Sequence, residues 1–307
     1  MWRPSVAGAA QARRTPYSVA GDWSMRACLR RLAALGSVCL VAACAASAGG
    51  PAAGPTGVPA ATVASTRVGG TATPAPASSP APASEHPAQL LDLTEWKVQL
   101  PVNAAGEMTG RYLEVLQPRL RTYASAPYFT VRGDGVQFRA PVNGVTTSGS
   151  RYPRSELREM ANGGTSMASW STESGTHTMV VEQAITAVPA VKKHVVAGQI
   201  HDGSDDVLTI RLEYPRLFVD HNGVNGPVLT SSYVLGTRFT VKIEAGDGQI
   251  KVYYNGSETP ADTFPKSGSS NYFKAGAYTQ SNCTREARCN TDNYGEVVIY
   301  RLEVTHR

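Results

Sequence analysis

Residues 272–280 read Tyr272-Phe273-Lys274-Ala275-Gly276-Ala277-Tyr278-Thr279-Gln280, and this alternation decides the fold class. Alternate residues of a β-strand share one face of a sheet. The odd-numbered positions carry small or apolar side chains, apart from Thr279. The stretch therefore predicts a strand with one packed face and one face of polar groups and a glycine, formed by Tyr272, Lys274, Gly276, Tyr278 and Gln280.

Two further segments show the same period of two. Arg154-Ser155-Glu156-Leu157-Arg158 places Arg154, Glu156 and Arg158 on one face, and Gln199-Ile200-His201 places Gln199 and His201 opposite Ile200. If the three polar faces line one concave sheet, they form a groove of cationic, amide, imidazole and phenol groups. Such a groove suits a polyanion that carries carboxylates, because arginine binds a carboxylate through two parallel hydrogen bonds.

Each segment alone also has a plainer interpretation. The Arg-x-Glu-x-Arg run is compatible with a solvated ladder of ion pairs, the Gln-x-His pair with a structural role, and the Tyr-x-Lys strand with ordinary exposed β surface. The occurrence of all three in one chain favours the groove. Gly276 in the middle of its face would then leave room for a ligand near the backbone.

The chain between residues 87 and 307 predicts an all-β fold. Short alternating or β-rich runs are separated by turn signals such as Asp134-Gly135, Asn143-Gly144 and Asp247-Gly248. We expect a single-domain β-jelly roll or sandwich with a concave substrate groove, and one short helix near residues 114–123. Besides the three segments above, the expected strands are 96–100, 128–131, 136–139, 176–185, 195–201, 207–213, 238–244, 250–254 and 296–304.

Residues 1–44 have the pattern of an export leader. Arg30 and Arg31 precede an apolar run at 32–43, which is too short to cross the roughly 30 Å core of a bilayer and fits a secretory signal. The run ends in Val41-Ala42-Ala43-Cys44, which resembles a bacterial lipoprotein processing site with Cys44 as the lipidated residue. An ordinary cleaved signal is the alternative, and Met25 is a candidate for the true start.

Residues 45–86 are almost entirely Ala, Pro, Gly, Ser, Thr and Val. Ala-Pro repeats favour an extended, disordered linker without a core. We therefore expect an exported protein, extracellular or at the cell surface, tethered through a lipid at Cys44 and otherwise free of the membrane.

The charge of the chain argues against nucleic acid as a partner. The 29 basic and 24 acidic residues include six arginines and one aspartate within residues 1–44, which leaves 23 of each sign in the remainder. The basic excess thus belongs to the leader and not to a binding face. Beyond the leader the chain has two cysteines, Cys283 and Cys289, and export favours a disulfide between them over two free thiols.

The three segments, in their order along the chain (154–158, 199–201 and 272–280), resemble the signature segments of alginate lyases of polysaccharide lyase family 7. The opening Trp96-Lys97-Val98-Gln99-Leu100-Pro101 and the phrase Tyr152-Pro153-Arg154 resemble the family as well, so that the likeness covers nearly all of residues 90–307. The resemblance implies a β-jelly roll whose concave face binds alginate. It also implies that Ile200, between Gln199 and His201, accompanies acceptance of guluronate-containing substrate.

The resemblance implies β-elimination across a 1,4-glycosidic bond, without a metal or other cofactor. Arg154 and Gln199, with His201 nearby, would neutralise the C6 carboxylate. His201, Tyr278 or both would remove the proton at C5, and Tyr278 would protonate the departing O4. Neighbouring sugars would be bound by the other groove residues, which are Arg158, Lys274, Gln280, Tyr272, Glu156 (chiefly by orienting Arg154 and Arg158) and Lys97.

Two other functions remain open at this point. A lyase for another polyuronate, such as glucuronan, would use the same groups, and a non-catalytic polyuronate-binding module would share the fold. A glycoside hydrolase is disfavoured, because it needs two carboxylates flanking the bond. The expected oligomeric state is a monomer.

Overall fold

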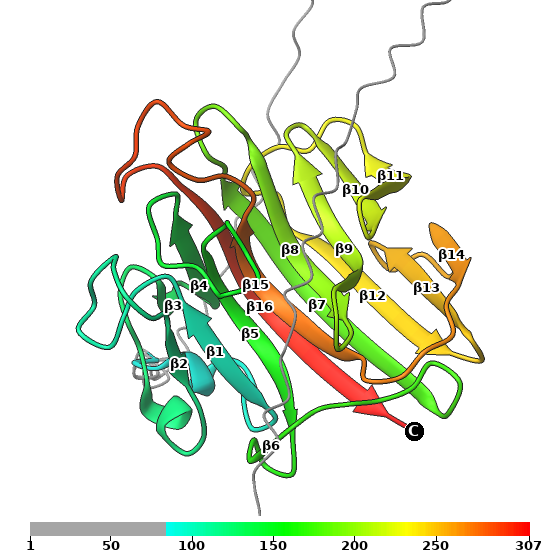
Figure 1. Cartoon of the computed structure of the whole chain (residues 1–307). Coiled ribbons are helices and arrows are strands. Elements are labelled where there is room, and N and C mark those ends of the chain that lie inside the picture. Colours follow the sequence, from blue (N-terminus) through cyan, green and yellow to red (C-terminus); the bar gives the residue numbers. More distant parts are fainter. Residues whose placement is uncertain (1–83) are drawn as a thin grey trace, which may run out of the picture. The chain divides into compact units, whose positions relative to one another are not determined.

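The computed structural model describes residues 84–307, which form two antiparallel β-sheets (Figure 1). The leader at 1–44, its Cys44 and nearly all of the linker at 45–86 lie outside the described residues. Within the described part, no helix is long and apolar enough to cross a membrane. Two short 3₁₀ helices, η1 (Pro87–Gln89) and η2 (Arg119–Thr122), are the helical elements of this part.

The nine-stranded sheet has the order β11-β10-β9-β8-β15-β5-β1-β2, with β6 paired to β5. The strands of this sheet are β1 (Trp96–Leu100), β2 (Leu113–Val115), β5 (Arg154–Ala161), β6 (Ser166–Met167), β8 (His194–His201), β9 (Asp206–Glu213), β10 (Arg216–His221), β11 (Val224–Thr230) and β15 (Tyr272–Thr279).

The seven-stranded sheet has the order β14-β13-β12-β7-β16-β4-β3. Its strands are β3 (Phe129–Arg132), β4 (Gly135–Pro141), β7 (Thr176–Ala187), β12 (Phe239–Gly246), β13 (Gln249–Tyr254), β14 (Asp262–Pro265) and β16 (Tyr294–His306). The order of the strands in both sheets departs from the order in the sequence, as in a jelly roll.

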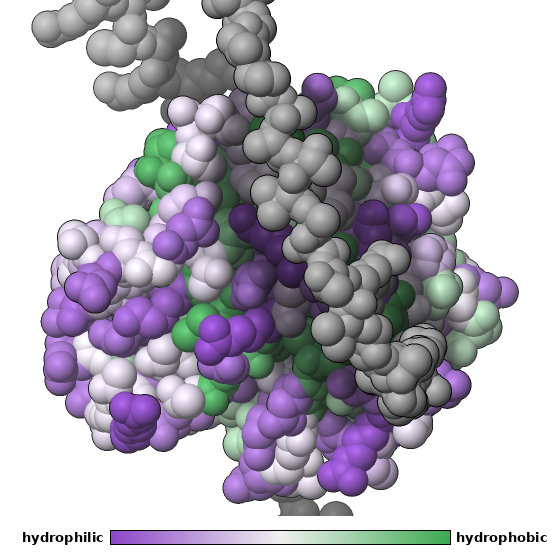
Figure 2. Space-filling view, turned by 180° about the vertical axis from the view of Figure 1, so that it is seen from behind, coloured by the Kyte–Doolittle hydropathy of each residue, from purple (hydrophilic) through white to green (hydrophobic). Residues whose placement is uncertain are grey.

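The core lies between the two sheets. Leu157, Ile200 and Phe273 point inward from the nine-stranded sheet, and Phe138 and Met179 point inward from the other; all five are fully buried. The sheets also meet through a hydrogen bond, because the hydroxyl of Thr279 in β15 donates to the carbonyl of Ala140 in β4 at 2.6 Å. In the space-filling view, hydrophilic side chains cover most of the margin of the face shown, and hydrophobic ones gather toward its middle (Figure 2).

The all-β prediction is confirmed, and the expected strands all occur with ends shifted by a few residues. The short helix expected near 114–123 is confirmed only as the four-residue 3₁₀ helix η2, because the segment begins in β2. Pro118 is the physical reason, since the residue before a proline is disfavoured in helical conformation. The sequence analysis also missed β6, β10, β11 and β14. Pro227 in β11 argues against a strand at the sequence level, because proline has no N–H to donate. It is tolerated here because β11 lies at the edge of the sheet.

A bulge in β8 turns the side chains of Gln199 and His201 toward the groove face of the sheet. Val195 and Ala197 belong to the core, yet Gln199 and His201 face the opposite side, so the alternation shifts by one residue between them. The pairing of β8 with β9 shifts its register between Val196 and Gly198, and its pairing with β15 shifts at the same level. Such an extra residue re-aims the side chains that follow it.

Candidate active site

The polar faces of β5, β8 and β15 line one groove in the nine-stranded sheet, with a volume of about 480 Å³. Strand register places side chains directly opposite one another across four neighbouring strands. This row runs Lys97, Arg158, Lys274, Gln199. Next to it, Tyr278 lies opposite Arg154 and Tyr272 lies opposite His201, so that the three segments converge as the groove prediction requires.

A buried carboxylate organises the floor of the groove. Glu156 is fully buried; it accepts hydrogen bonds from the ammonium of Lys274 at 2.5 Å, from Arg154 Nη1 at 3.2 Å and from the side-chain amide of Gln199. Burial by itself raises the pKa of Glu156, but Lys274 and Arg154 beside it bring the pKa below the ordinary value. Glu156 is therefore an anion that fixes three donors in place.

The pKa of the Lys274 ammonium is strongly lowered. Burial, followed by the positive charge of Arg154, lowers the pKa of its ammonium from 10.5 to about 8, although Glu156 opposes the shift. Desolvation disfavours a charged lysine unless an anion compensates it. Lys274 thus keeps its charge near neutral pH only because Glu156 lies against it.

Two arginines stack on the two tyrosines of β15. The guanidinium carbon of Arg154 lies 3.9 Å from the ring centroid of Tyr278, and that of Arg158 lies 3.8 Å from the ring centroid of Tyr272. The hydroxyl of Tyr278 also lies 2.8 Å from Ser150 Oγ. Each guanidinium therefore lies over an aromatic face at the distance of a cation–π contact.

His201 is arranged as a neutral base. Its Nδ1 lies 2.7 Å from the carbonyl oxygen of Asp202, so the proton belongs on Nδ1 and the lone pair on Nε2. Nε2 makes no hydrogen bond with the described residues. Burial, and to a lesser degree the charges of Lys274 and Arg154, lower the pKa of His201 below 6.5, against the effect of the Asp202 carbonyl. At neutral pH the imidazole is ready to accept a proton.

Several expected groove residues have other partners. Lys97 lines the groove but forms an ion pair with Glu114 at 2.7 Å. Arg158 lines the groove but forms no ion pair with Glu156, and its Nη1 donates to the carbonyl of Glu159 at 2.6 Å. Of the two arginines, Glu156 therefore orients only Arg154. Gln280 is buried and lies outside the residues that line the groove.

The explanation expected for Gly276 was wrong. A Cβ at this position would lie 2.7 Å from the carbonyl oxygen of Ser155 and 2.9 Å from Cα of Glu156, and the residue has φ of +135°. The room left by the missing side chain is therefore taken by the neighbouring strand β5. Gly276 allows β5 and β15 to approach closely and does not open space for a ligand.

The sequence analysis missed some residues that line the groove. Gln99, Glu114 and Tyr112 come from β1, from β2 and from the loop between them, and Asp205 and Asp206 lie beside His201. Burial, followed by the charge of Asp205, raises the pKa of Asp206 to about 6. Ser150 comes from the loop before β5. Gln99 could have been predicted, because it lies two residues after Lys97 and so shares its face of the strand. The residues from loops could not be predicted in this way, because loops have no such alternation.

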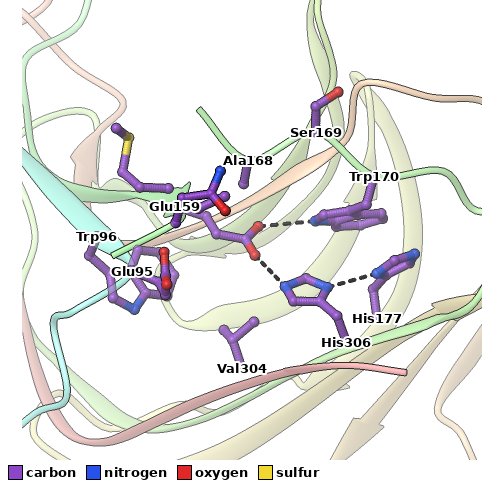
Figure 3. Close-up of a pocket in the computed structure, with 12 residues that line it drawn as sticks. Glu95, Trp96, Glu159, Ala168, Ser169, Trp170, His177, Val304 and His306 are labelled. Carbon is purple, nitrogen blue, oxygen red and sulfur yellow. Dashed lines mark hydrogen bonds and ion pairs between the residues drawn. The ribbon is translucent and has the colours of Figure 1, made fainter. Parts of the chain in front are cut away.

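A second pocket, of about 380 Å³, lies outside the groove (Figure 3). At its base, Glu159 Oε1 lies 2.6 Å from His306 Nε2, and His306 Nδ1 lies 2.7 Å from His177 Nδ1. Glu159 Oε2 accepts hydrogen bonds from the indole of Trp170 at 3.0 Å and from the backbone N–H of Phe273 at 2.7 Å. These contacts tie β5 to β15 and to β16.

The histidines of this second pocket have no free nitrogen. His177 Nε2 lies 3.0 Å from two carbonyl oxygens, so it carries a proton, and its Nδ1 accepts one from His306. His306 Nδ1 lies against His177 and its Nε2 against the carboxylate of Glu159, so both ring nitrogens of His306 are occupied by hydrogen-bond partners. The cluster is consequently a structural brace between β5, β7 and β16.

The loop after β15 contains the pair Cys283 and Cys289, which are joined in a disulfide. Within residues 84–307 no group of three histidine, cysteine, aspartate or glutamate side chains is placed to hold a metal ion. The groove brings together a cluster of cations and an amide, a neutral imidazole and a tyrosine. These groups suit the stabilisation of a carboxylate together with removal of a proton next to it.

An antiparallel jelly roll with a groove of these groups fits an enzyme that acts on an anionic polysaccharide. A family model described as alginate lyase matches residues 91–306. The chain accordingly belongs to the alginate lyases of polysaccharide lyase family 7, and it is an enzyme of that class.

Solved structures agree with this assignment. The alginate lyase from Corynebacterium sp. is 52% identical over 73% of this chain and 99% of its own, with a TM-score of 0.69. Alginate lyase AlgAT5 from polysaccharide lyase family 7 is 53% identical over 73% of this chain and 100% of its own, with a TM-score of 0.68. A variant of family 7 alginate lyase A1-II′ in complex with substrate is 26% identical over 73% and 97%, with a TM-score of 0.60. No curated protein matches the chain.

Proposed function

We propose that this enzyme cleaves the 1,4-glycosidic bonds of alginate by β-elimination and releases oligosaccharides with an unsaturated uronate end. The observation that carries the proposal is the convergence of Arg154, Gln199, His201 and Tyr278 on one groove. Family membership supports alginate as the substrate.

The first task of the reaction is to make the proton at C5 acidic. Arg154 and Gln199 would bind the C6 carboxylate and stabilise the charge that develops on it when the proton leaves. Both are already held by Glu156, so they need no reorganisation when substrate arrives. Donors that are fixed in advance around developing charge contribute about 3–4 kcal/mol each to lowering a barrier.

The second task is proton removal and departure of O4. His201 Nε2, with its free lone pair, would accept the proton from C5; the electron pair of that C–H bond forms the C4=C5 double bond as the C4–O4 bond breaks. Tyr278 would donate its hydroxyl proton to O4. Where H5 and O4 lie on the same side, as in mannuronate, Tyr278 would serve both tasks, aided by Arg154 stacked on its ring.

The experiment is absorbance near 235 nm, where the new double bond absorbs, with polymannuronate, polyguluronate and glucuronan tested separately. Tyr278→Phe should lose the absorbance increase on alginate blocks, since general acid–base catalysis contributes about 100- to 10,000-fold. Tyr253→Phe, on β13 of the other sheet, is the matched control and should keep it.

Each other outcome has a definite meaning. An increase on glucuronan alone would move the substrate to another polyuronate and keep the chemistry. Reducing ends without absorbance would mean hydrolysis. Binding of polyuronate with neither signal would mean a non-catalytic module.

We infer that the enzyme is exported and held at a membrane through a lipid on Cys44, because the leader and the linker have the composition of such a tether. Labelling of cells with radioactive palmitate should mark the full chain, and Cys44→Ser should abolish the label. A labelled Cys44→Ser variant, or a wild-type chain that stays unlabelled, would contradict the anchor.

A further inference from the structure

We propose that Ser150 is a positioning residue for Tyr278: its hydroxyl accepts a hydrogen bond from the neutral tyrosine and donates one to the phenolate. The proposal rests on the proposed function of Tyr278. It goes beyond that function by assigning a role to a residue outside the three signature segments.

Ser150 is held from its own side of the contact. Its Oγ accepts a hydrogen bond from the backbone N–H of Tyr152 at 3.0 Å and lies 3.1 Å from the carbonyl oxygen of the same residue. The backbone N–H of Ser150 donates to the carbonyl of Thr147 at 3.0 Å, which closes a turn. The side chain is therefore fixed by two backbone groups, with the hydroxyl of Tyr278 as its third neighbour at 2.8 Å.

The single proton of this hydroxyl has two possible acceptors. It points to the carbonyl of Tyr152 when Tyr278 is a phenol, and the phenol then donates its own proton to Ser150 Oγ. When Tyr278 becomes a phenolate, the proton of Ser150 can turn to the phenolate oxygen instead. The Tyr152 N–H supports Ser150 in both arrangements, so the exchange needs only rotation about one bond.

The exchange matters because the phenolate has two stabilising neighbours of different kinds. Arg154 acts through the ring face, with its guanidinium 3.9 Å from the centroid, whereas Ser150 acts on the oxygen itself. A hydrogen bond to a charged acceptor contributes more than a bond between neutral groups. Ser150 should thus position and stabilise the phenolate oxygen that exchanges protons with substrate.

The proton balance of the reaction is consistent with this role. When His201 takes the proton from C5 and Tyr278 gives its proton to O4, the enzyme is left with an imidazolium and a phenolate. Ser150 holds the phenolate until a proton from His201 or from solvent restores the phenol. When Tyr278 performs both tasks, it starts as the phenolate, which Ser150 stabilises before substrate reacts.

The decisive measurement is the titration of Tyr278 itself, which needs no substrate. With tyrosine labelled at Cζ, a carbon-13 resonance that disappears in Tyr278→Phe belongs to Tyr278, and its shift follows ionisation. Ser150→Ala should raise the midpoint of this titration by about one pH unit or more. Ser150→Thr, which keeps the hydroxyl, should restore it.

The matched control is Ser148→Ala, in the same loop. Ser148 is exposed, and its hydroxyl makes no hydrogen bond with the described residues. This substitution should leave the Tyr278 midpoint unchanged.

In activity, Ser150→Ala should lower kcat by about tenfold or more with little change in KM, and the pH optimum should move in the alkaline direction.

An unchanged Tyr278 midpoint in Ser150→Ala would overturn the proposal, even with lower activity, because a merely structural role of the loop moves activity but not the titration. If Ser150→Ala fails to fold, Ser150→Cys, with a weak thiol donor, provides the same test. A wild-type enzyme inactive on every polyuronate would refute the proposed function, and the titration would still decide the role of Ser150.

Discussion

The ammonium of Lys274 and the carboxylate of Glu156 lie 2.5 Å apart, and both side chains are almost completely removed from solvent. The two residues come from neighbouring strands, since Lys274 is on β15 and Glu156 is on β5. Each charge compensates the cost of burying the other. Together the two residues form the floor of the groove beneath the groups that would bind a carboxylate.

Glu156→Gln should therefore destabilise the protein by about 3–5 kcal/mol, because it leaves buried cations without their counter-ion. It should also reduce the lyase rate, since Arg154 and Gln199 lose the group that orients them. Chemical unfolding monitored by circular dichroism measures the first effect. The control is Glu303→Gln, which removes an exposed ion pair with Arg301 and should cost less than about 1 kcal/mol. Equal losses in the two variants would contradict a special role for Glu156.

The rate of elimination should fall as the pH rises through about 8, because Lys274 then loses its charge. The contribution of Lys274 to the free energy of unfolding changes with pH in the opposite direction to the rate. Its folded pKa lies below the unfolded value of 10.5, so the unfolded state binds more protons in this window, and the contribution rises between about pH 8 and 10.5. The loss of rate is thus expected without unfolding.

This pH dependence is checked with Lys274→Met, in which nothing titrates at this position. The variant should be slower at every pH, and its alkaline decline near pH 8 should disappear. Unfolding curves at pH 7 and 9 show whether the wild type stays folded. If the decline near pH 8 persists in Lys274→Met, another group is responsible for it.

Gly276→Ala should cost about 1–3 kcal/mol of stability and reduce activity. The new Cβ would meet the backbone of β5 at Ser155 and Glu156, and the residue has a left-handed φ. Gly256→Ala is the matched control: Gly256 also has positive φ, but a Cβ there has nothing within 4 Å. Its cost measures backbone strain alone, and the difference between the two variants measures the clash. No difference would mean that β5 moves away freely.

His306→Ala should destabilise the protein by about 1–3 kcal/mol, because buried Glu159 loses a hydrogen-bond partner. The kcat/KM of the folded enzyme on alginate should stay within about twofold, since the histidines of the second pocket have no free nitrogen for catalysis. Thermal unfolding and the 235 nm assay measure the two quantities at the same temperature. A large loss of kcat/KM at full folding would assign the second pocket a part in the reaction.

The strands that carry the groove could be predicted because each one shows its two faces within a few residues. The segments at 154–158 and 272–280 keep a strict period of two, and in the structure they pair side by side. The contact between Glu156 and Lys274 could not be predicted, because it depends on the register between strands separated by more than a hundred residues. The alternation of polar and apolar residues predicts which side chains share a face of a strand. It does not predict which other strand lies beside that strand.

Other features had no local signal. The bulge in β8 separates core residues from groove residues within one strand, which a simple period cannot indicate. Ser150 lies in a loop, where side-chain direction follows from turn geometry and not from periodicity. The cluster of Glu159, His177 and His306 is assembled from three strands, and no spacing in the sequence connects them.

The paired charges of the groove also determine how the enzyme meets its substrate in solution. The groove and its floor contain as many carboxylates as cations: Lys97, Arg154, Arg158 and Lys274 against Glu114, Glu156, Asp205 and Asp206. Such a surface has little far-reaching field, so electrostatic steering of a polyanion over more than a Debye length of about 10 Å is weak. Encounter should be nearly insensitive to ionic strength.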